Sequence, residues 1–179
     1  MIRIIEYADR YEADFRRLNL EWLEKYNLLE SHDLMVLDNP RGNVLDRGGY
    51  IWLALDEPQD ASVSSESQVA SPSQEDAQVV GTAALMHEHD DCYELAKMSV
   101  APAFRGRGIS KLLIEQCLQK AREIKVGKLI LYSNSQLQTA IRLYTKYGFQ
   151  HVPVIGTPFV TADVKMEWHG ESPSSLNEE

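Results

Sequence analysis

A short turn of alternating glycine and basic residues is the part of this sequence that most directly suggests chemistry. It reads Arg105-Gly106-Arg107-Gly108-Ile109-Ser110 and opens an amphipathic helical pattern. Glycine lets the backbone approach a ligand closely and adopt dihedral angles that other residues avoid. The first amides of a helix have no partner inside the helix, and the positive end of its dipole faces outward. The turn therefore predicts a phosphate site at the start of the helix, where additional N–H bonds and Arg or Lys contacts contribute most of the affinity.

Three kinds of phosphate-binding turn can be compared with this one. A Walker loop needs Gly-Lys followed by Ser or Thr after four spacer residues, and that pattern is absent. A dinucleotide fingerprint begins with two glycines like Gly106 and Gly108, but Lys111 stands where the third glycine belongs. The third kind holds the diphosphate of acetyl-CoA.

Two signatures follow one another in residues 93–149. The pattern Arg/Gln-x-x-Gly-x-Gly/Ala is met by Arg105, Gly108 and, imperfectly, Ser110. The pattern Ala-x-x-Leu-Tyr-x-x-x-Gly-Phe is met by Ala140, Leu143, Tyr144, Gly148 and Phe149. In this order and at this spacing they resemble the GNAT superfamily of acetyl-CoA-dependent N-acetyltransferases.

The resemblance implies a GNAT-like α/β (α+β) fold, with a mixed sheet of about seven strands that splays in its centre and is flanked by helices. Acetyl-CoA would enter the splay and serve as co-substrate. Backbone groups near Met98 and Val100 would pair with its pantetheine arm, and the amides of Arg105, Gly106, Arg107, Gly108, Ile109 and Ser110 would hold its diphosphate. The asparagine common in the second signature is Leu137 here, so that contact with the cofactor is either lost or moves to Asn134 or Ser135.

Two residues are candidates for proton transfer. Glu94 lies eleven residues before Arg105, where some members of the superfamily carry a glutamate that acts as the general base. The alternative interpretation of Glu94 is a carboxylate that faces solvent from a strand, because many members use a chain of water molecules in place of a glutamate base. Tyr144 matches the tyrosine that donates to the sulfur of coenzyme A, and a phenol with a pKa of about 10 suits that step. Its alternative is a core tyrosine on the face of a helix.

Other groups suggest weaker chemistry. The run from His87 to Cys92 contains metal-binding residue types, but neighbours on a tight hairpin rarely converge on one ion. We expect a polar turn and no metal there. Trp22, Tyr26, Glu21 and Glu30 could line an acceptor pocket, but aromatic residues at helical spacing are more often core, so we leave them out.

The elements that position these residues can be read from hydrophobic spacing. Asp9 could cap a helix carrying Phe15, Leu18 and Trp22, and a shorter helix is expected over 30–37. Later helices begin near Ile109, ending at Gly127, and at Ser135, ending at Gly148; the last should bury Leu137, Ala140, Ile141 and Tyr144. Strands are expected near Ile2–Ile4 and over 50–55, 79–86, 93–100, 129–132 and 164–168.

The net charge of −9 over 179 residues is unevenly spread. Residues 57–78 and 171–179 together hold eight acids and no lysine or arginine, whereas residues 97–128 hold eight bases and two acids. We therefore predict one domain over 1–170 with a mobile loop insertion at 57–78, followed by an acidic tail at 171–179. The basic stretch favours an anionic ligand. The near-neutral body and the acidic segments argue against nucleic acid.

These observations predict an N-acetyltransferase that moves acetyl from acetyl-CoA to a primary amine, by direct transfer in a ternary complex. The acceptor is a small-molecule or protein amine. The alternative is a catalytically silent acyl-CoA-binding or regulatory domain of the same fold. Two cysteines, an acidic N-terminus and the lack of a long apolar run favour a cytoplasmic protein without membrane association. Because GNAT proteins are often dimers, the resemblance also implies a homodimer as a possible assembly of this chain.

Overall fold

The computed structural model describes residues 1–58 and 77–168. Within these residues the 3₁₀ turns η1 (Asp9–Tyr11), η2 (Leu45–Arg47) and η4 (Pro102–Phe104) accompany the longer elements. The helices are α1 (Glu12–Lys25), α2 (Ser31–Asp38), α3 (Pro40–Asn43), α4 (Ile109–Glu123) and α5 (Gln138–Lys146). The strands are β1 (Ile2–Glu6), β2 (Tyr50–Asp56), β3 (Gln78–His89), β4 (Cys92–Val100), β5 (Lys128–Ser133), β6 (Phe149–Val152) and β7 (Val164–Trp168).

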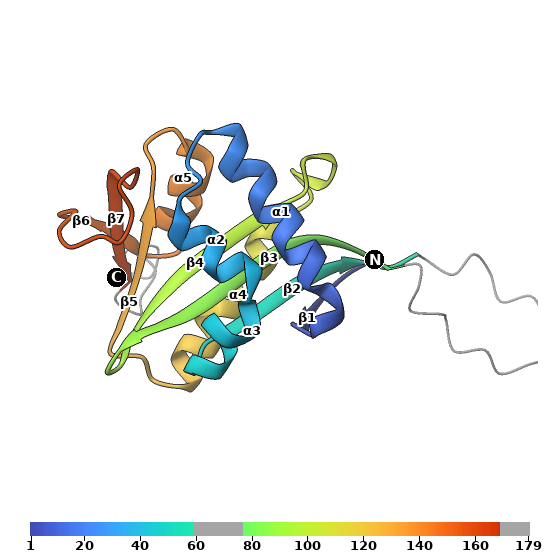
Figure 1. Ribbon diagram of the computed structural model, residues 1–179, viewed down its shortest axis with the longest axis horizontal. Helices are drawn as coiled ribbons and strands as arrows, with labels where there is room; N and C mark the ends of the chain where they lie inside the picture. The colour runs from blue at the N-terminus through green and yellow to red at the C-terminus, as the bar shows by residue number, and fades with distance from the viewer. Residues whose placement is uncertain (59–76, 169–179) are drawn as a thin grey trace, which may run out of the picture.

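The strands of the described residues form one seven-stranded sheet in the order β1-β2-β3-β4-β5-β7-β6. Every neighbouring pair is antiparallel except β4 with β5, which is parallel. The helices α1, α2 and α3 lie on one face of the sheet and α4 lies on the other (Figure 1). The mixed, helix-flanked sheet confirms the fold that the sequence predicts.

Two buried clusters stabilise the molecule, one on each face of the sheet. Strand β2 shows the alternation that this requires: Ile51, Leu53 and Leu55 face the helices α1 and α2, whereas Trp52 and Ala54 face α4. Both faces of β2 are thus covered, so its sequence is a nearly continuous apolar run.

Several predicted boundaries are wrong, each for a local reason. Asp9 does not cap α1, since it lies in the preceding 3₁₀ turn and its carboxylate accepts from Arg41. Ser135 does not cap α5, because its amide and hydroxyl donate to Asp163 instead. Helix α4 ends at Glu123, and Lys125, with a φ of 52°, takes the left-handed position before Gly127 is reached.

The predicted strands and the inner face of α5 also need correction. Strand β3 continues to His89, beyond the apolar run that marks it in the sequence. Strand β6 is not evident from hydropathy, because two of its four residues are exposed. Of the residues that α5 was expected to bury, Ile141 is buried and Tyr144 is half-buried. That side of α5 faces the cavity described below.

Other predictions made from composition are not resolved by the fold. Residues 59–76 and 169–179 fall outside the described part of the chain, so most of the predicted loop and the whole acidic tail lie there. The single domain over 1–170 stays a prediction. None of the helices in the described ranges combines the length and apolar character that a bilayer-spanning helix needs.

Candidate functional site

The centre of the sheet opens between its two parallel strands. Strands β4 and β5 pair only from Cys92 to Glu94, opposite Lys128 to Ile130. Beyond Glu94, β4 remains paired with β3 as far as Val100. The edge of β4 from Leu95 to Val100 therefore has no strand partner on the β5 side. An unpaired strand edge of this kind can accept an extended ligand as if it were an added strand.

A bulge in β4 accompanies the opening. The register between β3 and β4 shifts in the segment that carries Lys97, whose φ of 52° is unusual for a residue with a side chain. The Thr82 hydroxyl donates to the Lys97 carbonyl oxygen at 2.7 Å and so satisfies it. The Asn19 amide in turn donates to Thr82 Oγ1 at 3.1 Å. Bulges bend strands and re-aim side chains, and this one is fixed by buried polar groups.

The glycine turn follows β4 and leads directly into α4. Gly106 and Gly108 both have a φ of 75°, in the left-handed region, and a Cβ on either would meet no protein atom within 4 Å. Gly108 is the residue before the first turn of α4, and no side chain caps that end of the helix. The amides of Ile109, Ser110 and Lys111 are therefore available to an anion.

The opening and the turn line one cavity of about 760 Å³. Glu94, Tyr144 and most of the predicted contacts for acetyl-CoA lie along it: Met98, Val100, Arg105, Gly106, Gly108, Ile109, Ser110 and Asn134. Arg107 is not among the lining residues; its guanidinium lies over the Phe104 ring, 4.9 Å from the centroid, and 3.8 Å from Asp56. Residues from β4, α4, β5 and α5 thus line one cavity, and their roles stay predictions.

Glu94 is buried on β4, not exposed on a strand face. Its exposure is 3%, and Oε2 is buried without a hydrogen-bond partner among the described residues. Burial, and then the charge of Glu88, raise the pKa of Glu94 to about 8, while Lys97 acts in the opposite direction. A buried carboxylate with a raised pKa in a cavity is typical of groups that transfer protons.

Tyr144 lies on α5, across the cavity from β4. Its ring packs edge-on against Phe149 with centroids 5.9 Å apart. Burial, with a smaller contribution from Cys117, raises the pKa of Tyr144 to about 12. The phenol therefore keeps its proton at neutral pH and can donate it.

Asn134 lines the cavity, but its side chain is engaged within the protein. Its amide nitrogen donates to the Thr161 carbonyl at 2.8 Å, and its Oδ1 accepts from the Gln136 amide at 3.0 Å. These bonds connect the end of β5 to the segment before β7. The predicted contact of Asn134 with acetyl-CoA stays a prediction.

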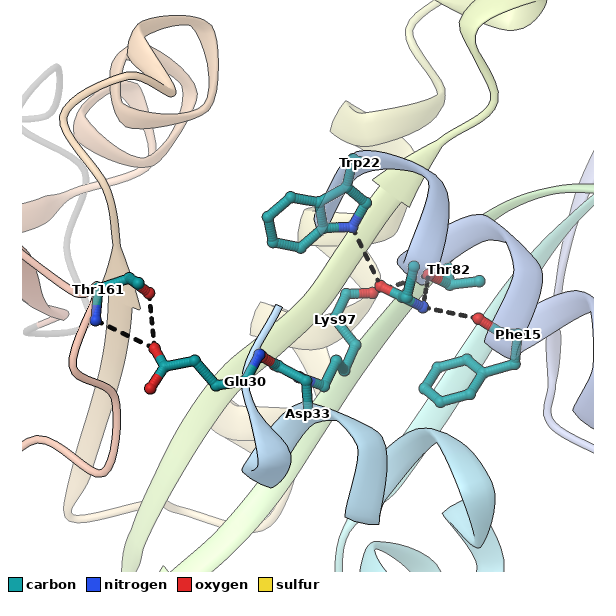
Figure 2. Close-up of polar contacts among 8 residues, drawn as sticks. Phe15, Trp22, Glu30, Asp33, Thr82, Lys97 and Thr161 are labelled. Atoms are coloured by element: carbon teal, nitrogen blue, oxygen red, sulfur yellow. Dashed lines mark hydrogen bonds and ion pairs between the residues drawn. The ribbon is translucent and has the colours of Figure 1, made fainter. Parts of the chain in front are cut away.

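The far end of the cavity carries charged and aromatic side chains that the sequence did not assign. Asp33 Oδ1 accepts from Lys97 Nζ, and both side chains are buried. Figure 2 shows this pair beside Glu30, whose carboxylate reaches Thr161, with the Trp22 ring above it in that view. Trp22 and Tyr26, which were left out of the predicted site, line this end together with Phe159.

Spacing alone offers no signal for most of these residues. Asp33 and Lys97 are 64 positions apart, and the contact between Glu30 and Thr161 spans 131. A signal exists for Trp22 and Tyr26, because two large aromatic residues follow one another at a helical step of four. The same spacing also fits a helix that packs into the core, and here one face of α1 both packs against the core and lines the cavity.

The hairpin between β3 and β4 does not assemble a metal site. Among the described residues, no group of three or more His, Cys, Asp or Glu side chains is placed to hold an ion. His87 instead takes part in the turn, where its Nε2 lies 2.8 Å from the Asp90 carbonyl oxygen.

Comparison with known proteins finds a domain and relatives to which part of this chain is similar. The model of the acetyltransferase (GNAT) domain matches residues 73–151, which include β4, the glycine turn and α5. Escherichia coli (strain K12) has an uncharacterized N-acetyltransferase, YjgM, that is 36% identical over 88 residues, covering 48% of this chain and 53% of YjgM. The human N-acetylaspartate synthetase is 38% identical over 78 residues, covering 43% of this chain and 26% of that protein. The matches thus span about half or less of these relatives.

Solved structures agree over the whole fold. A GNAT-family acetyltransferase from Staphylococcus aureus Mu50 superposes with a TM-score of 0.78 at 20% identity, covering 96% of this chain and all of that one. The PaiA N-acetyltransferase from Thermoplasma acidophilum, solved with coenzyme A, gives 0.63 at 14% identity and covers 94% of this chain and 98% of that one. The opened sheet thus belongs to a fold that this chain shares with GNAT-family structures, and the glycine turn at the start of α4 lies in the part of the chain that matches the acetyltransferase (GNAT) domain.

Proposed function

We propose that this chain is an N-acetyltransferase that transfers the acetyl group of acetyl-CoA directly to a primary amine in a ternary complex. The observation that carries the proposal is the position of Glu94. This buried carboxylate, with one oxygen unpartnered, lines the same cavity as an open strand edge and a turn suited to a diphosphate.

The residues fit acetyl-CoA as a substrate. The unpaired β4 edge around Met98 and Val100 suits the amide groups of its pantetheine arm, and the amides at the start of α4 suit its diphosphate. Arg105 from the turn and Arg142 from α5 line the same cavity and add positive charge for the phosphates. Bound there, acetyl-CoA supplies an activated carbonyl carbon and a thiolate leaving group.

The side chains can complete the proton transfers of the reaction. The amine must be neutral to attack the carbonyl carbon, so Glu94, ionised, accepts one of its protons directly or through water. A C–N bond forms while the C–S bond breaks. Tyr144 donates its proton to the departing sulfur, so that coenzyme A leaves as the thiol, and the second proton released by the acylated nitrogen returns to the tyrosinate.

The relatives support the choice of an amine acceptor. The proteins matched at 36–38% identity are named as an N-acetyltransferase and as N-acetylaspartate synthetases, the latter name indicating an N-acetylated amino acid. For this chain we therefore propose a small-molecule or protein amine as the acceptor. A cytoplasmic location and a homodimer belong to the same proposal.

The alternative is a domain that binds acyl-CoA without turnover, and one assay separates the two. Release of free thiol from acetyl-CoA is measured against a panel of amines, with calorimetric binding of coenzyme A as a parallel reading. Tyr144→Phe is expected to lower kcat by about 10²-fold or more while leaving the affinity for acetyl-CoA nearly unchanged. Wild-type binding without thiol release on every amine would favour the silent domain, and unchanged kcat in the variant would remove the role of Tyr144.

A further inference from the structure

The far end of the cavity, which carries Trp22, Tyr26, Asp33 and Lys97, is called the acceptor end below. It is bounded by a segment that the family signatures do not cover. We call residues 159–163, just before β7, the closing segment. Glu30, at the start of α2, holds it with both carboxylate oxygens: Oε1 accepts from the Val160 amide at 2.8 Å, and Oε2 accepts from the Thr161 amide and hydroxyl at 3.0 and 2.6 Å. Burial opposes ionisation of Glu30, but the hydrogen bonds from Thr161 and Val160 lower its pKa overall. Glu30 therefore acts as a charged latch.

The strand β5 side of the cavity anchors the closing segment as well. Asn134 donates to the Thr161 carbonyl at 2.8 Å, and Asp163 accepts from the amide and hydroxyl of Ser135 at 2.7 and 2.6 Å. With Glu30 attached to α2 and these residues following β5, the closing segment joins the two sides of the opened sheet.

The latch is itself tied to the bulge in β4. The Glu30 amide donates to Asp33 Oδ2 at 3.0 Å, and Asp33 Oδ1 accepts from Lys97. Figure 2 shows the resulting chain of polar contacts from Lys97 through Asp33 and Glu30 to Thr161. Because each step is a charge-assisted or buried hydrogen bond, the segment is fixed against the strand that would carry the acetyl donor.

Phe159 is the residue that this arrangement places in the cavity wall. Its ring meets His32 edge-on with centroids 5.1 Å apart, Tyr132 at 6.0 Å, and lies 5.8 Å from Lys97 Nζ. These three partners come from α2, β5 and β4, so the ring spans the gap between the separating strands. Trp22 and Tyr26 form further aromatic lining of the same cavity.

The space left for an acceptor is consequently limited. The whole cavity is about 760 Å³, within the roughly 300–1,000 Å³ that usually serves one small ligand, and the pantetheine arm must share it. A polypeptide amine would also bring a chain that has to leave past Phe159. From these contacts we infer that the acceptor is a compact small-molecule amine, and that Phe159, held in place by Glu30, sets its upper size limit. This inference rests on the proposed acetyltransferase function and names its substrate class.

The experiment compares amines that differ in bulk. Compact probes are free amino acids and arylalkylamines; bulky probes are hexapeptides bearing a free N-terminus or a lysine side chain. In the wild type, kcat/KM for the best compact amine should exceed that for the best peptide by about 100-fold or more. Phe159→Ala and Glu30→Ala should each narrow that ratio by about tenfold, mainly through a lower KM for the bulky probes. A fold defect alone would lower both values together and leave the ratio unchanged.

A matched control tests whether the latch matters as a contact and not as a charge. Glu24→Gln removes an exposed carboxylate on α1, away from the cavity lining, and should keep the wild-type ratio. Glu30→Gln, which keeps one acceptor oxygen, should fall between wild type and Glu30→Ala. Hydrogen exchange should accelerate at the amides of Val160 and Thr161 in Glu30→Ala and stay unchanged in Glu24→Gln.

Calorimetry on the protein loaded with coenzyme A separates this inference from the proposed function. If no amine is acetylated but compact amines bind and peptides do not, the transferase proposal fails and the size limit stands. Peptides that bind or react as well as compact amines would overturn the size limit while leaving the transferase proposal intact. Wild-type selectivity retained in both Phe159→Ala and Glu30→Ala would overturn the assignment to these residues.

Discussion

The two ends of the cavity are built by different means. The end suited to acetyl-CoA is made mostly of backbone groups that lie close together in the sequence: the β4 edge, the glycine turn and the first turn of α4. The acceptor end is made of side chains brought together from distant positions, such as Asp33 with Lys97 and Glu30 with Thr161. Backbone groups recognise what every member of a family binds, whereas side chains can vary without disturbing that recognition.

Glu94 stands where the two ends meet, and replacing it should have the largest effect. Glu94→Gln removes the proposed base, so kcat should fall by about 10²–10⁴-fold while the affinity for coenzyme A changes little. Loss of turnover with retained binding would separate chemistry from the acetyl-CoA end. A kcat within a few-fold of wild type would instead assign the proton transfer to a water chain.

The pH dependence gives the same residue a second test. Glu94 must be ionised to act as a base, and its pKa is raised to about 8, so wild-type kcat/KM should rise with pH and level off above that value. Glu94→Gln should lose this limb. The free energy of unfolding of the wild type should change with pH in the opposite sense to its activity. In the folded wild type Glu94 keeps a proton that the unfolded chain releases near pH 4.5. The wild type should therefore lose stability relative to Glu94→Gln as pH rises from about 4.5 to about 8. A difference in Tm between the wild type and Glu94→Gln that stays constant from pH 4.5 to pH 8 would contradict the raised pKa of Glu94.

Breaking the buried ion pair between Asp33 and Lys97 should have the next largest effect, at the acceptor end of the cavity. The Lys97 and Asp33 side chains are 5% and 4% exposed. Lys97→Met leaves the Asp33 carboxylate buried without a partner, which should lower the free energy of unfolding by about 3–5 kcal/mol. The double variant Asp33→Asn/Lys97→Met removes both charges and should recover much of that loss in urea unfolding. Additive losses would mean that the pair is not coupled.

The difference between the ends also explains what could be predicted from the sequence. Most strands and the longer helices follow from local periodicity, whereas the sheet and the acetyl-CoA contacts were predicted from the resemblance of two local signatures; nearly all of those contact residues line one cavity. Ser135 was misjudged because a capping residue cannot be distinguished from one bonded to Asp163, 28 positions away. Phe159 was missed because its segment has no regular period, and its role depends on Glu30.

Strain at the glycine turn should produce a smaller effect confined to the acetyl-CoA end. Gly108→Ala forces a side chain into a φ of 75° and should cost about 1–2 kcal/mol of stability, while the displaced turn raises KM for acetyl-CoA. Gly48→Ala is the matched control, because Gly48 has a φ of 86°, equally free surroundings and no place in the cavity lining. It should lose similar stability and leave KM unchanged. Equal KM values in the two variants would show that the turn does not contact acetyl-CoA.

The smallest effects should distinguish the two arginines of that turn, which the sequence treats alike. Arg105 lines the cavity, with its Nε 3.4 Å from the Val100 carbonyl oxygen, whereas Arg107 lies over Phe104 and near Asp56. An exposed charge contact is worth about 0.2–1 kcal/mol, so Arg105→Ala should raise KM for acetyl-CoA by up to about fivefold. Arg107→Ala should change it by less than about twofold, because its charge is directed toward β2. If both variants raised KM equally, recognition at this end would depend on the summed charge of the turn and not on the direction that its backbone gives each side chain.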